Sequence, residues 1–203
     1  LGLSYESLRS DNPGLIFASI TGYGPEGPYK DRPAYDHVIQ GLVGVMDDFG
    51  QYSDDKAPVP VRNFLVDKVA STTLTQGILA GLLARERNGG TGQTVSVSLL
   101  EAYAALMLPA IMINHTFQND DAERIQKIDM YHPIRTRDGH VIGHIQTDAQ
   151  FEGMCRTADM DGLIGDERFK DAWSRMTHYE SLWAEMEKGT SKQDTRTVID
   201  KAA

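Results

Sequence analysis

Asp67 is the residue whose type and setting best suit chemistry. It follows the apolar segment "FLV" and directly precedes residues 68–85, whose apolar side chains recur at helical spacing. Aspartate is a common N-cap, so a helix cap is the simpler interpretation of the local pattern. The same position would also hold the carboxylate against unpaired amides at the positive end of the helix dipole, which favours its ionised form. A carboxylate nucleophile needs that form, so Asp67 is also a candidate nucleophile.

The loop "TGYGPEGPYKDRP" (residues 21–33) is the second candidate site. Gly22, Gly24 and Gly27 match the spacing of a dinucleotide fingerprint, but no helical pattern begins there. The loop also lacks the Lys-Ser/Thr pair that ends a Walker loop, and internal prolines remove amides that a phosphate nest would use. The local pattern therefore favours a rigid connection over a phosphate site.

The remaining reactive side chains have simpler interpretations. His132, His140 and His144 gather around a predicted hairpin, but no cysteine or second carboxylate completes a ligand spacing, so no metal is expected. Cys155 is the single cysteine of the chain, which rules out an intrachain disulfide. Its local pattern is that of a half-buried bystander rather than of a nucleophile.

Composition narrows the class of partner. The net charge of −9 argues against a nucleic-acid partner, because phosphate binding needs a basic surface. The longest apolar stretch, residues 99–113, is too short to span a membrane and contains Glu101 and Pro109. We therefore expect a soluble, cytoplasmic protein that binds neither a membrane nor nucleic acid.

Strand and helix patterns alternate along the first part of the chain, which predicts an α/β fold. The expected elements are a buried strand, a helical stretch, the helix after Asp67, a strand and a buried helix: residues 15–20, 34–50, 68–85, 92–100 and 101–114. A second unit follows, with a hairpin at 132–145 that turns at Asp138-Gly139 and then several short helices. The predicted domains are residues 1–124 and 125–203.

Three segments together resemble the family III CoA-transferases, which include formyl-CoA transferase, a carnitine CoA-transferase and alpha-methylacyl-CoA racemase. The segments are "NPGLIFASITGYGPEGPYKDRPAYDHVIQGLVGVM", "DKVASTTLTQGILAGLLARERNGGTGQTVSVSLLEA" and "YHPIRTRDGHVIGHI". The resemblance covers roughly residues 1–190. It implies part of a Rossmann-like large domain followed by a small α+β domain, in a fold whose members form interlinked dimers.

The resemblance also implies a reaction and a set of site residues. Asp67 would attack an acyl-CoA, and CoA would pass through aspartyl anhydrides and an aspartyl-CoA thioester to a small carboxylic acid. CoA or acyl-CoA is thus the expected ligand, without a metal, and the full-length protein is expected to be a homodimer. The positions that the resemblance assigns to CoA binding are Thr21, Gly22, Tyr23, Gly24, Tyr35, Asp36 and Ser98.

Two alternatives stay open. The racemase branch pairs its aspartate with a histidine in a "GHD" segment, whereas this chain has "AYD" with Tyr35 in that place. A tyrosine hydroxyl ordinarily keeps its proton at neutral pH, so we prefer the transferase to the racemase. No segment here resembles the nucleotide-fold half with which the family begins or the return of its chain at the carboxyl end. The second alternative is therefore a non-catalytic folded fragment of such an enzyme.

Overall fold

The computed structural model describes residues 3–53, 55–113, 115–116 and 131–202. The chain divides into two compact units, Leu1–Ile125 and Gln126–Ala203, and each has its own buried core. The domain boundary predicted between residues 124 and 125 lies outside the described residues.

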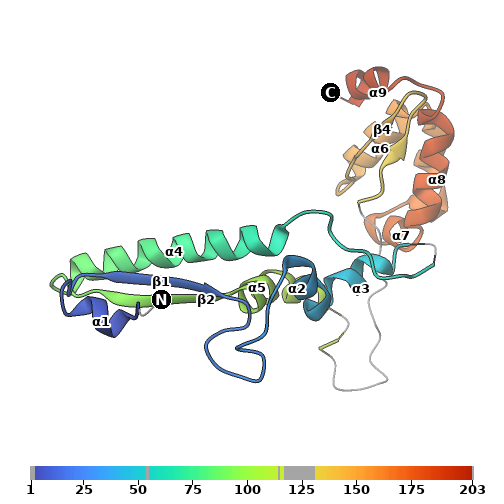
Figure 1. The fold of residues 1–203 in the computed structure, drawn as a ribbon. Coiled ribbons are helices and arrows are strands. Elements are labelled where there is room, and N and C mark those ends of the chain that lie inside the picture. Colours follow the sequence, from blue (N-terminus) through green and yellow to red (C-terminus); the bar gives the residue numbers. More distant parts are fainter. Residues whose placement is uncertain (1–2, 54, 114, 117–130, 203) are drawn as a thin grey trace. The chain divides into compact units, whose positions relative to one another are not determined.

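Unit 1 is built on two parallel strands joined by a helical crossover (Figure 1). The strands pair in register from Ile16 with Gln93 to Thr21 with Ser98. This arrangement confirms the predicted α/β class for this part of the fold. The elements are α1 (Tyr5–Arg9), β1 (Ile16–Thr21), α2 (Asp36–Val43), α3 (Val45–Gly50), α4 (Leu65–Arg87), β2 (Gln93–Ser98) and α5 (Leu99–Ile111).

Helix α4 packs along both strands and runs antiparallel to them (Figure 1). Gly81 packs against the start of the strands and Gly77 against Val95, where a Cβ on Gly77 would lie 2.6 Å from the valine Cγ1. Asp67 precedes Gly77 by ten residues, about 15 Å along the helix axis. Ser98 follows Val95 by about 10 Å along its strand. The first turn of α4 therefore lies toward the end of unit 1 at which both strands finish.

The helical stretch predicted for residues 34–50 is interrupted at Gly44. This residue has a φ of +86° and is both the C-cap of α2 and the N-cap of α3. Only glycine adopts this left-handed conformation without steric cost, so the chain can turn here between two short helices. The prediction of one continuous helical pattern is thus wrong at this residue.

Burial in unit 1 is lower than the sequence pattern predicts. Ile20 of β1 is 43% exposed, and Leu106 of the supposedly buried α5 is also exposed. A strand buried on both faces needs layers above and below it, and the described residues cover β1 incompletely. The buried core of the unit lies among α2, α3, α4 and α5 and consists of Ile39, Val43, Val45, Val66, Tyr103 and Ile111.

Unit 2 opens with the predicted hairpin, in which Ile134 pairs with Val141 and Arg135 with His140. The turn at Asp138-Gly139 is confirmed by this antiparallel register. The elements are β3 (Ile134–Arg135), β4 (His140–Val141), α6 (Asp148–Thr157), η1 (Asp161–Gly165), η2 (Glu167–Phe169), α7 (Ala172–Thr177), α8 (Tyr179–Thr190) and α9 (Thr195–Ala202). Its core consists of Ile134, Phe151, Cys155, Ala158, Leu163, Phe169, Leu182, Trp183 and Met186.

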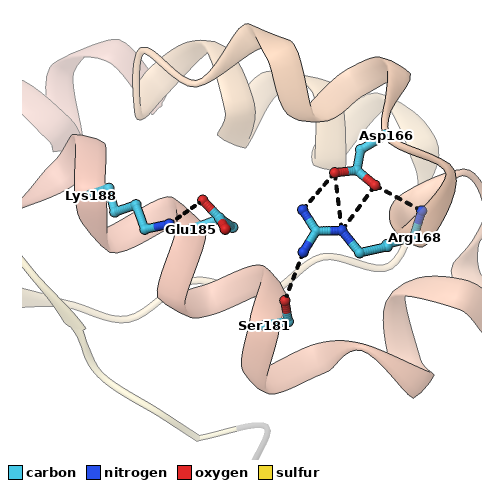
Figure 2. Close-up of polar contacts among 5 residues, drawn as sticks. All are labelled: Asp166, Arg168, Ser181, Glu185 and Lys188. Carbon is cyan, nitrogen blue, oxygen red and sulfur yellow. Dashed lines mark hydrogen bonds and ion pairs between the residues drawn. The ribbon is translucent and has the colours of Figure 1, made fainter.

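Polar contacts tie the short helix η2 to α8 in unit 2 (Figure 2). The Arg168 guanidinium donates to both carboxylate oxygens of Asp166, at 2.6 to 3.1 Å, and its Nη1 donates to Ser181 Oγ at 3.2 Å. The hydrogen bonds that Asp166 accepts from the Arg168 side chain and from the Arg168 backbone N–H hold the pKa of Asp166 below its usual value. Lys188 and Glu185 form a separate ion pair on α8.

Candidate active site

Asp67 lies in the first turn of α4 but does not cap it. The helix begins at Leu65, and Phe64 occupies the N-cap position without a side-chain hydrogen bond. The prediction that the helix starts at residue 68 with Asp67 as its cap is therefore wrong. The physical reason is that a carboxylate from another helix accepts the hydrogen bonds of the first amides of α4.

The capping group is Asp36, in the first turn of α2. Its Oδ2 accepts a hydrogen bond from the backbone N–H of Val66 at 2.7 Å and from that of Asp67 at 3.2 Å. Asp36 is only 5% exposed. The amides of a helix N-terminus have no partners within their own helix, so a buried carboxylate there satisfies two of them.

Gln40, one turn further along α2, holds the other oxygen of Asp36. Its Nε2 donates to Asp36 Oδ1 at 2.6 Å, and its Oε1 accepts from the backbone N–H of Val61 at 2.9 Å. The same Nε2 lies 3.2 Å and 3.3 Å from the carbonyl oxygens of Val61 and Asn63. Gln40 thereby links α2 to the segment that leads into α4.

Sequence analysis did not identify Gln40 as a site residue. Two polar residues spaced four apart, Asp36 and Gln40, share one face of α2 with the core residues Ile39 and Val43. A polar pair on an otherwise apolar buried face is a signal that sequence reasoning could have used, because buried polar side chains need partners.

Tyr103 of α5 lies within the electrostatic reach of this network. Burial raises the pKa of the Tyr103 hydroxyl, and the negative charge of Asp36 raises it further. The hydroxyl is buried without a hydrogen-bond partner among the described residues. The surroundings of Asp36 are therefore closely packed and contain an unsatisfied polar atom.

The Asp67 side chain, by contrast, is exposed. Within the described part of the chain, its carboxylate takes part in no hydrogen bond or ion pair. The neighbouring Lys68 ammonium donates instead to Asn63 Oδ1 at 2.6 Å. At the positive end of a 23-residue helix, this exposed carboxylate is well placed to attack an electrophile.

The loop after β1 is closed at its base by close packing. A Cβ on Gly22 would lie 2.3 Å from the Cβ of Ala34, so only glycine fits there. Thr21 Oγ1 accepts from the N–H of Gly24 at 3.0 Å, and the carbonyl of Gly22 accepts from Leu100 N–H at 3.1 Å. The loop is thus anchored to the first turn of α5.

The structure brings Thr21 and Ser98 together, whereas Tyr35 is an exposed residue that contacts His37. Thr21 and Ser98 are register partners at the carboxyl ends of the strands. Ser98 is buried; its hydroxyl caps α5, accepting from Glu101 N–H at 3.1 Å and donating to Glu101 Oε2 at 2.7 Å. Tyr35 is 63% exposed and stacks on His37. Tyr23 packs edge-on against Tyr29.

Among the residues that the structure describes, no group of His, Cys, Asp or Glu side chains is arranged to hold a metal ion. Over the same residues, no helix is both long enough and apolar enough to cross a membrane.

Fold and site together define an α/β protein with an aspartate on the first turn of its crossover helix that has no partner among the described residues. Comparison with known proteins gives the family. The model of CoA-transferase family III matches residues 1–203, and the chain belongs to this family. The resemblance inferred from the sequence motifs is confirmed.

Several characterised proteins and a crystal structure are similar to the chain. The succinate–glutarate CoA-transferase of Agrobacterium fabrum is 32% identical over 87% of this chain and 44% of its own length. The acetyl-CoA:oxalate CoA-transferase of Acetobacter aceti is 31% identical over 98% of this chain and 52% of its own. The crystal structure of Rv3272 from M. tuberculosis superposes with a TM-score of 0.82 at 28% identity, over 99% of this chain and 52% of the other. The chain thus spans about half the length of these relatives.

Proposed function

We propose that the polypeptide containing this chain transfers CoA from an acyl-CoA to a carboxylic acid, with Asp67 as the nucleophile. Family membership supports the reaction class. The observation that supports the residue is the exposed, unpaired carboxylate of Asp67 on the first turn of α4, among the described residues. The opposite arrangement, with this carboxylate capping its own helix, would have favoured a purely structural role.

The proposed reaction proceeds by alternating acyl transfers at Asp67. A carboxylate oxygen of Asp67 attacks the thioester carbon, the C–S bond breaks, and CoA leaves as a thiolate with a mixed anhydride formed. The thiolate then attacks the aspartyl carbonyl carbon and releases the donor acid, which leaves an aspartyl-CoA thioester. The acceptor carboxylate repeats the two steps in reverse order and leaves as its CoA thioester. No oxidant and no net proton is required.

For the CoA arm, we assign the loop residues Thr21 to Gly24 at the carboxyl edge of the strands. Ligands of α/β folds bind beyond the carboxyl ends of the strands, which supports this placement. Ser98 acts in this proposal by holding the first turn of α5, since its hydroxyl is buried and paired with Glu101. Short dicarboxylic acids are the acceptors to test first, because the names of the two transferases described above specify oxalate, succinate and glutarate.

Covalent trapping tests the proposal. The complete natural polypeptide that contains this sequence is mixed with succinyl-CoA, quenched, and examined by intact-protein mass spectrometry. We expect a CoA-sized adduct that hydroxylamine converts to a hydroxamate on the Asp67 peptide. Asp67→Asn should abolish the adduct and lower turnover by at least about a thousandfold. Asp47→Asn is the matched control, since Asp47 is an exposed carboxylate in the first turn of α3.

The outcomes separate the alternatives. An adduct that survives in Asp67→Asn would reject Asp67 as the nucleophile. Exchange of the substrate α-proton with deuterated water, without transfer of CoA, would favour the racemase. An adduct in the complete polypeptide but not in residues 1–203 alone would show that this chain is a folded but inactive part of the enzyme. A homodimeric state and a cytoplasmic location stay predictions.

A further inference from the structure

We propose that Asp36 is the positioning residue of the nucleophile Asp67 and that Gln40 fixes the orientation of Asp36. This inference rests on the proposed function of Asp67. The resemblance to the family assigns Asp36 to CoA binding; the geometry points instead to a role beneath the nucleophile, out of contact with the substrate.

The first argument is that both carboxylate oxygens of Asp36 already accept hydrogen bonds from the protein. Oδ2 accepts from the N–H groups of Val66 and Asp67, and Oδ1 accepts from Gln40 Nε2. The residue is almost fully buried. A CoA contact would require a ligand to displace these donors from a packed interior, which would leave buried amides unsatisfied.

The second argument is that one of the two capped amides belongs to Asp67 itself. Phe64 at the N-cap position makes no side-chain hydrogen bond, and no described side chain other than that of Asp36 caps the first turn of α4. The carboxylate of Asp36 therefore determines where the backbone of Asp67 lies and from which direction its side chain leaves the helix. Attack on a thioester needs the reacting atoms aligned at about 3 Å, and a misplacement of about 1 Å costs roughly 100-fold in rate.

The third argument concerns Gln40, whose amide can be oriented in one way only. Its Oε1 accepts from Val61 N–H, so its Nε2 must point toward Asp36 and the nearby carbonyl oxygens. A donor facing Asp36 Oδ1 requires an acceptor at that position. Gln40 thus selects an acceptor oxygen at residue 36 and holds it under the start of α4.

The test separates positioning from binding in variants of the complete natural polypeptide. Two quantities are measured for each variant: the rate at which a saturating acyl-CoA forms the adduct on Asp67, and the dissociation constant of a non-reactive CoA thioether. We expect Asp36→Ala to form the adduct about 100-fold more slowly, with the dissociation constant within about threefold of wild type. Asp36→Asn, which keeps an acceptor for the α4 amides, should recover part of the rate.

Gln40→Ala and the double variant test the proposed order of action. If Gln40 works through Asp36, adding Gln40→Ala to Asp36→Ala should slow adduct formation no further, although Gln40→Ala alone slows it. Thr147→Ala is the matched control, since it removes a side-chain cap from α6 of unit 2 and should leave the adduct rate unchanged. Circular dichroism and thermal unfolding verify that each variant is folded; Asp36→Asn carries the test if Asp36→Ala does not fold.

Distinct results would overturn the inference. An unchanged adduct rate in folded Asp36→Ala or Asp36→Asn would show that Asp36 does not position the nucleophile. A raised dissociation constant with an unchanged saturated rate would make Asp36 a CoA contact, as the family resemblance implies. Failure of the wild type itself to form an adduct on Asp67 would reject the proposed function, and this inference with it, before any substitution at residue 36 is considered.

Discussion

At the residue scale, burial separates a reactive side chain from an inert one. Asp67 is exposed and unpaired within the described chain, whereas Cys155 is fully buried in the core of unit 2. Burial raises the pKa of the Cys155 thiol from 9.0 to about 11, and the charge of Asp161 contributes in the same direction. A thiol with so high a pKa is not a nucleophile at neutral pH.

The raised pKa predicts how stability depends on alkaline pH. The unfolded thiol ionises near 9.0 and the folded thiol near 11. The contribution of the protonated Cys155 thiol to the stability of the fold is therefore complete below pH 9. It is lost as the pH rises toward 11, because unfolding then releases a proton. Urea unfolding of the wild type at several pH values between 8 and 11 should show this loss. Cys155→Ala should show a weaker dependence, and equal slopes would refute the prediction.

Residue-scale prediction succeeded where the signal was local and failed where the partner was distant. The Asp138-Gly139 turn follows from adjacent residues, and the hairpin confirms it. The role of Asp67 as a cap was predicted from its neighbours alone, but the true cap, Asp36, is 31 residues earlier in the chain. A sequence window that covers one helix start cannot contain a hydrogen bond of that span.

At the element scale, helix caps supply local stability in unit 2. Thr147 Oγ1 accepts from Gln150 N–H, and the Gln150 side chain accepts from Thr147 N–H at 3.1 Å, which completes a capping box at α6. Helix α7 has its own cap, in which Asp171 Oδ1 accepts from Ser174 N–H at 2.7 Å. Helices α6 and α7 therefore each begin at a defined residue.

Removal of the α6 cap should weaken unit 2 by a predictable amount. Thr147→Ala leaves the Gln150 amide without its acceptor, which costs about 1 kcal/mol of unfolding free energy. Thr147→Ser retains the hydroxyl and should lose only a small part of that. Chemical denaturation followed by circular dichroism measures both, and an equal loss in the two variants would contradict the capping argument.

The periodicity of the sequence predicted some helices and strands of unit 1 and missed the division of another. Strand and helix periodicity predicted β1, β2, α4 and α5 in the right order, because each has a continuous pattern. The division between α2 and α3 was missed, since Gly44 also fits a helical pattern as a small packing residue. Its left-handed conformation ends α2, where the Gly44 N–H donates to the carbonyl oxygens of Gln40 and Gly41.

At the scale of the whole molecule, each unit has a separate buried core. Leu182 belongs to the core of unit 2 and Val66 to that of unit 1, and both are almost completely buried. Cores without shared residues can lose their packing independently. Thermal unfolding of the chain should therefore show two transitions, one for each unit.

Core substitutions test this independence. Leu182→Ala should reduce the stability of unit 2 by about 3 kcal/mol, because it removes buried methyl groups and leaves a cavity. Calorimetry should then show one transition at a lower temperature and the other in its original place. Val66→Ala is the reciprocal variant and should move the other transition. A single transition that moves as a whole in both variants would show that the units unfold together.

The parallel pairing of β1 with β2 also has a kinetic consequence. Ser19 and Ser96, which face each other across the pair, are 77 residues apart. The chain must close that loop before the strands gain any hydrogen bonds, whereas the hairpin of unit 2 forms between near neighbours. Non-local pairing slows folding. The hairpin of unit 2 should therefore form before the β1–β2 pair, and the end of unit 1 that carries Asp67 should be completed only when the crossover helix docks.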